Sequence, residues 1–505
     1  MVIDAPFTSF SPDQPALNNP GLVRAHNCFA GRGSTQGGVT LYPLKSAALF
    51  SSTSMASRPI GSAIGQDRDG NAKVYAGCSS ALYRLSPQDR QWQDISRSGG
   101  YTTANGDRWR SVEFGSLQIF ANGWNDPPQF IDMSQDVKFA DLTTLVKGKY
   151  IAQHKGFTIL GNTYDALDGG VPNRVRWSGI EAPGDWTFSP ATMADFQDIY
   201  NYGNITGIVT DDQVWVLLER GIVQMQFVGA PYAFSFTDRV TGKGCSVPQS
   251  VVTVSGMHFF LSDDGFYLLQ GGNLTNIGTG KVNRWFLENF DASQANLMTV
   301  AADPRETTVM WQYASKNAPV GKPDMMLIFN WTSGEWTTAD ATTSFIYNAV
   351  SLPYTLDRLG EEFGTLDDVP ASFDDPVWAG GENMLFGMSE TGAVYSFSGP
   401  TMDLSVETPE FQLSRMVPNE GRADTAYVFA ARPLFEGDAV GRVQVGTRSL
   451  QNGSMTWSQL AECNAQTGFA FFRTLSRYQR FRVSVSGEWR KAYALQVDAK
   501  AAGRR

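Results

Sequence analysis

The stretch that decides the fold is residues 246–290, SVPQSVVTVSGMHFFLSDDGFYLLQGGNLTNIGTGKVNRWFLENF. Short apolar and β-branched runs within it predict four strands in up-and-down order, at 251–254, 257–261, 266–270 and 274–277. Gly256, Asp264-Gly265 and Gly271-Gly272 separate these runs, and such residues tolerate the positive φ of a tight hairpin turn. One sheet of this size cannot bury both of its faces alone, so the stretch predicts neighbours of the same kind.

Similar units recur along the chain. An apolar strand followed by a polar turn and a tryptophan occurs at 81–92 and at 327–336, and the strand returns without the tryptophan at 393–397. The spacing of roughly 40–50 residues is the length of a propeller blade. We place seven units near 57–96, 105–143, 147–190, 198–240, 246–290, 296–340 and 344–398. The sequence therefore predicts an all-β protein with a β-propeller of about seven blades over 57–400.

The flanking segments differ in pattern. Residues 1–56 are rich in Pro and Gly and predict an extended N-terminal arm, which either packs on a neighbouring subunit or supplies a strand that completes the last blade. Residues 353–378 hold seven acidic residues and one basic residue, and predict a loop insertion that is either solvated or a partner contact. Longer alternating strands after residue 400 predict a separate C-terminal β-sandwich-like domain at 401–505.

Composition limits the function classes. The net charge of −10 excludes a chain that binds nucleic acid through an overall basic surface. No apolar run reaches the length of about 18 residues that a membrane-spanning helix needs, and the first residues lack the features of a signal peptide. Four widely scattered cysteines predict reduced, structural thiols.

Motifs for cofactor chemistry are missing. The three histidines lie far apart without metal-ligand spacing, and Gly280-Lys281 lacks the rest of a phosphate-binding loop, so we expect no metal and no other cofactor. Some propellers are glycosidases, which use a pair of catalytic carboxylates. Asp and Glu are plentiful in this sequence, so such a pair stays an alternative. The nearest match to a sialidase turn, at 449–457, lacks its Asp and lies outside the blades. We expect no enzymatic activity, and a carbohydrate-binding or carbohydrate-cleaving propeller is the alternative.

Two further stretches are distinctive. Residues 172–186 predict a strand and a Pro-Gly turn, with Trp177 and Trp186 either packed between blades or flanking an exposed Asp185. Residues 473–505 carry nine basic residues against two acidic ones, which indicates one basic surface on an acidic body or an ordinary charged strand face. Arginines of this stretch could pair with acidic loops of a neighbouring subunit. The candidate interaction residues are Arg477, Arg480, Arg482, Asp367, Asp368, Asp374 and Asp375.

Parts of the chain resemble the tail hub, or nozzle, proteins of short-tailed bacteriophages, including those called packaged-DNA stabilisation proteins. Lys243-Gly244-Cys245 leading into 251–277 and 282–290 resembles a central blade of that family. Residues 473–485 resemble the family's ending, and 173–178 with Asp185-Trp186 is similar to related phage proteins.

The resemblance implies a structural protein of the virion tail, made in the bacterial host cytoplasm. Such proteins form a six-fold ring below the portal and adaptor, retain packaged DNA, pass it during ejection and dock fibres or spikes. A ring closes through heterologous contacts between its subunits. An acidic lumen would let DNA slide without sequence recognition, because it repels the phosphate backbone.

Overall fold

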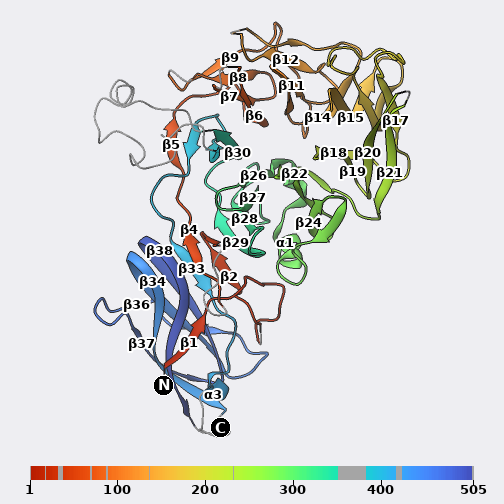
Figure 1. Cartoon of the computed structure of the whole chain (residues 1–505). Coiled ribbons are helices and arrows are strands. Elements are labelled where there is room, and N and C mark those ends of the chain that lie inside the picture. Colours follow the sequence, from red (N-terminus) through yellow and green to blue (C-terminus); the bar gives the residue numbers. More distant parts are fainter. Residues whose placement is uncertain are drawn as a thin grey trace.

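The computed structural model describes residues 2–17, 19–31, 38–68, 71–86, 89–135, 137–230, 232–350, 383–416 and 424–502. Six four-stranded antiparallel sheets and four strands of a larger sheet form seven blades around a central channel, and a second β domain lies to one side of them (Figure 1). The prediction of a propeller of about seven blades followed by a C-terminal β domain is confirmed.

The first four blades follow the predicted units, except that the last strand of blade three lies beyond the unit at 147–190. Each of these blades begins with its innermost strand. Blade one comprises β6 (Gly61–Gln66), β7 (Ala72–Gly77), β8 (Leu82–Leu85) and β9 (Trp92–Asp94). Blade two comprises β10 (Arg110–Phe114), β11 (Leu117–Ala121), β12 (Gln129–Asp132) and β13 (Ala140–Asp141). Blade three comprises β14 (Lys147–His154), β15 (Phe157–Asp165), β16 (Gly169–Trp177) and β17 (Asp195–Asp198). Blade four comprises β18 (Ile205–Thr210), β19 (Val214–Leu218), β20 (Gly221–Gly229) and β21 (Ala233–Thr241).

Blade five is the stretch from which the fold was predicted. Its strands are β22 (Val247–Val254), β23 (Met257–Ser262), β24 (Gly265–Gln270) and β25 (Asn273–Asn276). Gly265 has a φ of +138°, and a Cβ added there would lie 2.0 Å from the side chain of Asn283, so the hairpin turn requires glycine. The sequence did not predict helix α1 (Asn283–Asn289) and the 3₁₀ helix η1 (Ala292–Leu297) that follow this blade.

Aromatic side chains join one blade to the next. Blade six comprises β26 (Thr299–Asp303), β27 (Thr308–Tyr313), β28 (Met325–Asn330) and β29 (Glu335–Asp340). The buried Trp311 of β27 packs on Phe266 of blade five with 4.7 Å between ring centroids, and its Nε1 donates to Ser250 O across 2.9 Å. Contacts of this kind bury apolar area and also satisfy the indole N–H, which fixes the angle between blades.

The last blade is completed by the N-terminal segment. Its strands are β30 (Phe345–Val350), β31 (Asn383–Met388), β32 (Val394–Ser396) and, at the outer edge, β5 (Ala48–Ser51). The sequence left two placements open for the N-terminal segment, on a neighbouring subunit or in the last blade. β5 lies in the last blade and completes it. The predicted acidic insertion at 353–378 lies outside the described residues.

The rest of the N-terminal segment is not the extended arm that we predicted. β1 (Val2–Pro6) pairs with the C-terminal β38, β2 (Arg24–His26) pairs with both β29 and β33, and β3 (Cys28–Ala30) pairs with β4 (Leu41–Pro43). Each short strand covers an edge that would otherwise expose unpaired backbone groups. This segment therefore ties the propeller to the second domain.

The C-terminal domain is built on two long strands. β34 (Thr425–Arg448) and β38 (Tyr478–Ala502) pair along their whole length, and register shifts near 434–437 bend the pair into a curled sheet. The shorter elements are β33 (Leu404–Glu407), α3 (Leu413–Met416), β35 (Thr456–Trp457), β36 (Ala461–Glu462) and β37 (Ala470–Ser476). The sequence predicted longer strands after residue 400, and one of them, β34, runs through the bend as a single strand.

A single sheet connects the two domains. Its strands follow the order β26-β27-β28-β29-β2-β33-β38-β34-β35, from the wall of the propeller channel to the far side of the C-terminal domain. Within the described ranges, no helix is long and apolar enough to cross a membrane.

Candidate functional site

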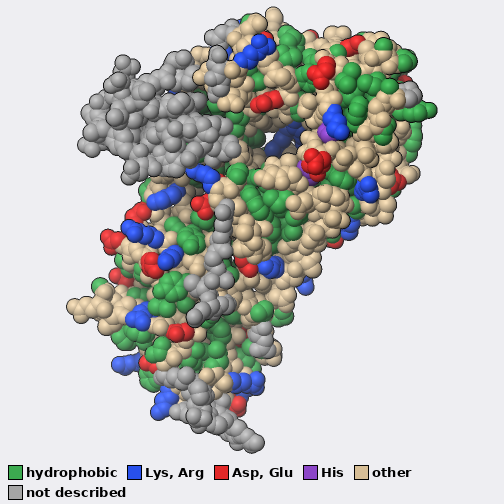
Figure 2. All heavy atoms as spheres, viewed as in Figure 1, with side chains coloured by type: hydrophobic (Ala, Val, Ile, Leu, Met, Phe, Trp, Pro, Cys, Tyr) green, Lys and Arg blue, Asp and Glu red, His purple; other side chains and the backbone are tan. Residues whose placement is uncertain are grey.

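All seven blades of the propeller line its central channel. Residues of the seven inner strands and the loops before them line a space of about 550 Å³. Figure 2 shows this hollow in the propeller, with basic side chains visible inside it. Arg108 and Arg110 are the charged members of the lining, and no described lining residue is Asp or Glu.

Both arginines are held by backbone carbonyls and aromatic rings. Arg108 extends from the start of blade two and donates to Asn296 O, which precedes blade six. Arg110 donates to Lys149 O across 3.3 Å and lies 4.5 Å from the centroid of the Tyr150 ring. Sequence analysis missed this pair. The signal was the run Arg108-Trp109-Arg110 ahead of a strand, but only the blade geometry shows that this strand is innermost.

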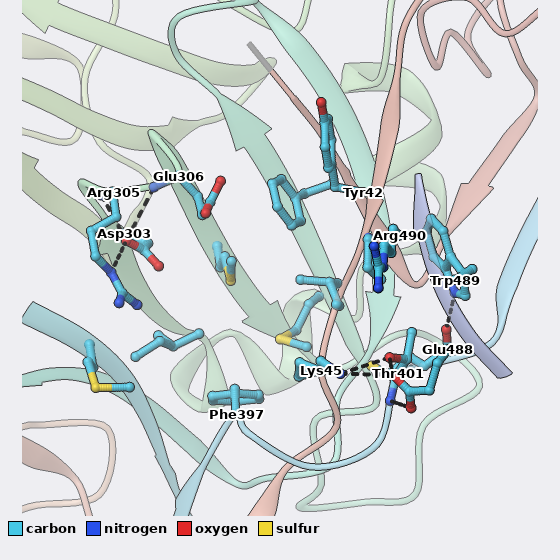
Figure 3. A pocket seen from close by; sticks show the side chains of 18 of the residues that line it. Tyr42, Lys45, Asp303, Arg305, Glu306, Phe397, Thr401, Glu488, Trp489 and Arg490 are labelled. Atoms are coloured by element: carbon cyan, nitrogen blue, oxygen red, sulfur yellow. Dashed lines mark hydrogen bonds and ion pairs between the residues drawn. The ribbon is translucent and has the colours of Figure 1, made fainter. Parts of the chain in front are cut away.

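A second hollow of about 660 Å³ lies where the propeller meets the C-terminal domain (Figure 3). Methionines of blades six and seven, Met310, Met326 and Met384, form much of its apolar wall. Lys45 Nζ pairs with Glu488 Oε2 across 3.2 Å at its rim, and Thr401 donates to the same carboxylate. Flexible methionine side chains fit an apolar group of variable shape. The carboxylates of Glu306 and Asp438 also line this hollow.

The arginines that the sequence selected are engaged within their own chain. Arg480 Nε lies 2.8 Å from Glu407 Oε1 and Arg482 Nη2 lies 3.0 Å from Glu407 Oε2, while Arg477 lies 3.5 Å from Asp424. Glu407 is on β33 and is buried. The structure therefore supports an internal role for Arg480 and Arg482, and a contact with a neighbouring subunit stays a prediction. Their predicted partners, Asp367, Asp368, Asp374 and Asp375, lie outside the described residues.

The distinctive stretch at 172–186 is a packing feature. Trp177 and Trp186 are buried, as one of the two interpretations expected. Arg174 contacts three carboxylates, of Asp165, Asp168 and Asp198, at 3.4, 2.5 and 2.6 Å. The pKa of Arg174 is raised, mainly by its side-chain hydrogen bond to Asp198. This arginine therefore stabilises blade three through its ion pairs.

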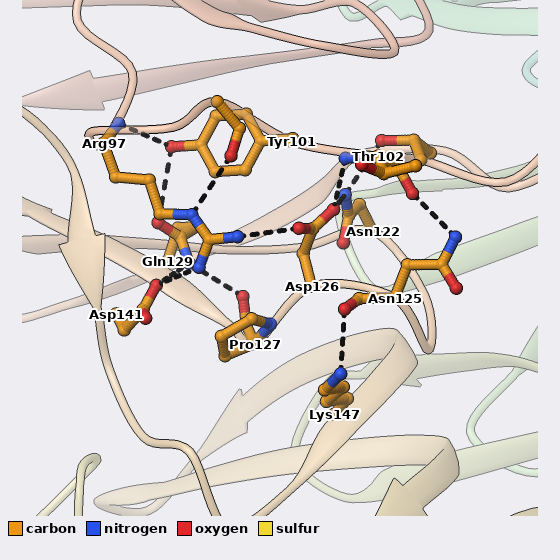
Figure 4. A network of polar contacts seen from close by, with 12 residues as sticks. Arg97, Tyr101, Thr102, Asn122, Asn125, Asp126, Pro127, Gln129, Asp141 and Lys147 are labelled. Carbon is orange, nitrogen blue, oxygen red and sulfur yellow. Dashed lines mark hydrogen bonds and ion pairs between the residues drawn. The ribbon is translucent and has the colours of Figure 1, made fainter.

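A polar network holds the connection between blades one and two (Figure 4). Arg97 pairs with Asp126 at 2.8 Å and with Asp141 at 2.5 Å, and its backbone N–H donates to Tyr101 Oη. Burial raises the pKa of Tyr101 to about 12. Each charge in this network has a partner, so the network fixes a loop and offers no reactive group.

Histidines, cysteines and carboxylates elsewhere in the described chain are dispersed or buried. Among the residues that the structure describes, no three His, Cys, Asp or Glu side chains gather where they could hold a metal ion. Burial raises the pKa of Cys28 and of Cys245, which keeps both thiols in the weakly nucleophilic neutral form. His258 is fully buried and contacts Thr253 and Asp211.

Exposed apolar side chains occur on both parts of the molecule. The outer set lies where β16 of blade three and β20 of blade four end, and consists of Phe188, Val228 and Tyr232. The domain set, on β34 and β37, consists of Phe429, Phe471 and Leu475. Figure 1 places these elements at opposite ends, and among the strands that the structure describes β37 pairs with β34 alone. Alternation in 470–475 was the available signal for the domain set.

Comparison with known proteins finds distant structural likenesses. No family model matches the chain, and no curated protein matches it. Similar solved structures include the extracellular domains of proteins of B. thetaiotaomicron described as a hybrid two-component system and a one-component system. They are 10% and 12% identical, with TM-scores of 0.38 and 0.40, and cover 86% and 94% of this chain. The chain spans 48% and 62% of their lengths.

The WD40 domain of Neurospora crassa Pan2 is also similar. It is 8% identical, with a TM-score of 0.34, over 59% of this chain and 91% of that domain. Likenesses at this level carry no argument about function.

Proposed function

We propose that the protein is a structural subunit of a bacteriophage tail, a hub or nozzle that forms a ring and continues the DNA channel below the portal and adaptor. The resemblance of 243–290 and 473–485 to that family supports this assignment. In this proposal the ring retains packaged DNA in the virion, passes it during ejection, and offers docking surfaces to fibres or spikes. No enzymatic step is part of the role.

The pair of exposed apolar sets is the observation that carries the proposal. A closed ring requires a heterologous contact, in which one surface of a subunit meets a different surface of the next. In this proposal the outer set and the domain set are the two surfaces, and the elements that carry them lie at opposite ends of the molecule. Clusters of exposed apolar side chains often mark protein interaction sites.

The connection between the domains also suits a ring subunit. The sheet that runs from β26 to β35 joins the channel wall to the C-terminal domain through continuous strand pairing. Such a connection keeps the two apolar sets in a fixed relation, which a ring with a defined number of subunits needs. The net charge of −10 is compatible with DNA that passes without sticking.

Native mass spectrometry and negative-stain imaging of the purified chain test the proposal. We expect closed rings for the wild-type chain and monomers for the double variant Phe471→Glu/Leu475→Glu, which changes exposed side chains and leaves the core intact. Leu450→Glu is the matched control, because Leu450 is exposed on a turn of the same domain, outside both sets.

The alternative predicts a different result. A wild-type chain that stays monomeric at every concentration, and binds glycans saturably on an array, would favour a carbohydrate-binding propeller. If the double variant forms rings as well as wild type does, the tail assignment stands, but the domain set is not part of the interface between subunits.

A further inference from the structure

The channel lining carries charge of one sign, opposite to that of the whole chain. Arg108 and Arg110 line the space of about 550 Å³ at the end where the inner strands begin. Arg58 lies beside them, since it donates to Ser344 O at 3.0 Å and Ser344 precedes the lining residue Phe345. No described lining residue carries a carboxylate.

These three arginines have no ion-pair partner among the described residues. Arg58 donates to two carbonyl oxygens, of Gly321 and Ser344, and Arg108 donates to Asn296 O with its guanidinium carbon 5.8 Å from the Phe345 ring centroid. A guanidinium has five N–H donors, so backbone carbonyls use only some of them. The other donors remain for a ligand in the channel.

The arrangement of Arg108 also places it at the channel mouth. It extends from blade two to the segment before blade six, and Gln249 of blade five donates back to Gly106 O of the blade-two loop across 3.3 Å. Burial, together with the positive charges of Arg110 and Arg58, lowers the pKa of Arg108 to about 9. A bound anion would offset both causes, because it supplies a negative charge beside Arg108, whereas the carboxylate of Glu390 acts on Arg58.

We propose that the mouth of the central channel binds a phosphate-type oxyanion between Arg108 and Arg110, with Arg58 adding positive charge beside them. The planar fork of arginine donors matches the oxygens of a phosphate group. The volume of about 550 Å³ is within the range of small-molecule sites, so the ligand is free phosphate or the phosphate group of a small molecule. The inference uses residues of one chain and does not depend on the ring assignment.

Calorimetric titration of the full chain in a phosphate-free chloride buffer tests the site, with inorganic phosphate as the first probe and pyrophosphate as the second. We expect saturable binding of one ion per chain and a rise in melting temperature, since a ligand that binds only the folded state stabilises it. Sodium chloride at matched ionic strength should produce neither effect. Tighter binding of pyrophosphate would indicate a larger phosphate compound, and equal or weaker binding would indicate free phosphate.

Charge-neutralising variants locate the ligand. Arg108→Gln and Arg110→Gln should each weaken phosphate binding at least tenfold, whereas Arg284→Gln should bind like wild type. Arg284 is the matched control because its side chain is exposed and pairs with Glu288 on α1, outside the channel lining.

Melting without phosphate separates binding from a structural role. Arg108→Gln removes one of three like charges, so in phosphate-free buffer it should melt no lower than wild type. The proposal is overturned if Arg108→Gln lowers the melting temperature equally with and without phosphate, if either channel variant keeps wild-type affinity, or if chloride reproduces the response.

Discussion

Replacement of Glu407 by Gln should loosen the junction between the propeller and the C-terminal domain. Glu407 is 7% exposed and pairs with both Arg480 and Arg482 at 2.8 and 3.0 Å. Removal of one partner from a buried ion pair costs about 3–5 kcal/mol, because the other charge is left uncompensated. The two arginine side chains are 22% and 38% exposed, so water screens part of this loss, and we expect about 2–3 kcal/mol.

Hydrogen exchange of the amides of β33 is the direct assay, since it measures the local free energy of opening in a protein too large for a single two-state transition. A loss of this size corresponds to a fall in protection of about 30- to 150-fold. Glu462→Gln is the control in the same domain. Its pair with Arg442 is largely exposed and should contribute less than about 1 kcal/mol.

The result that would refute this reasoning is a Glu407→Gln protein whose β33 amides exchange within about threefold of wild type, which is less than 1 kcal/mol. The arginines would then be available to a partner, as the sequence first suggested. A triple Arg477/Arg480/Arg482→Glu variant would place carboxylates against Glu407, so we expect it to unfold the domain and not merely to block assembly.

Three further changes should have measurable effects. Trp311→Ala should destabilise the propeller by about 3–5 kcal/mol, seen as a lower melting temperature, because it removes a buried indole and its bond to Ser250 O; an unchanged temperature would contradict the packing account. Asp13→Ala should speed exchange in α1 by about fivefold, because the Asp13 carboxylate accepts from the backbone N–H of Arg284 and Trp285 and a lost cap costs about 1 kcal/mol; unaltered exchange there would show that this cap adds nothing. Burial lowers the pKa of His258 below its ordinary 6.5, so its contribution to stability is complete above that pH and is lost as the pH falls below it. Melting between pH 7.5 and 5.5 should therefore fall less in His258→Gln than in wild type, and equal slopes would exclude this residue.

The blades were predictable because each blade is formed by strands and turns that are close together in the sequence. In blade five, Asp264-Gly265 and Gly271-Gly272 define hairpins whose strands follow one another within a few residues, and the structure places β23, β24 and β25 there. Helix α1 was missed because seven residues are too short for a clear helical period. The signal was present in the spacing of Phe286 and Phe290, whose ring centroids lie 5.2 Å apart.

The contacts that join distant segments were not predictable from one sequence. The pairing of β5 with β32 and of β2 with β33 depends on which strand edges the folded blades leave unpaired. A strand of three or four residues is too short for its sequence pattern to indicate which strand it pairs with. The same holds for the arginines. Their charge was visible at 473–505, but Glu407, which neutralises two of them, lies about 75 residues earlier on another strand.

The pairing of β1 with β38 sets a limit on when the protein can finish folding during its synthesis. Val2–Pro6 are synthesised well before Ala494–Asp498, with which they pair. At about 5–20 residues per second, the first strand waits roughly 25–100 s for its place in the sheet. β5 waits almost as long, because the strands of blade seven that it completes are made after six other blades. Segments that are synthesised early thus complete both domains late. Until β32 and β38 are made, β5 and β1 have no strand to pair with, and the propeller stays incomplete.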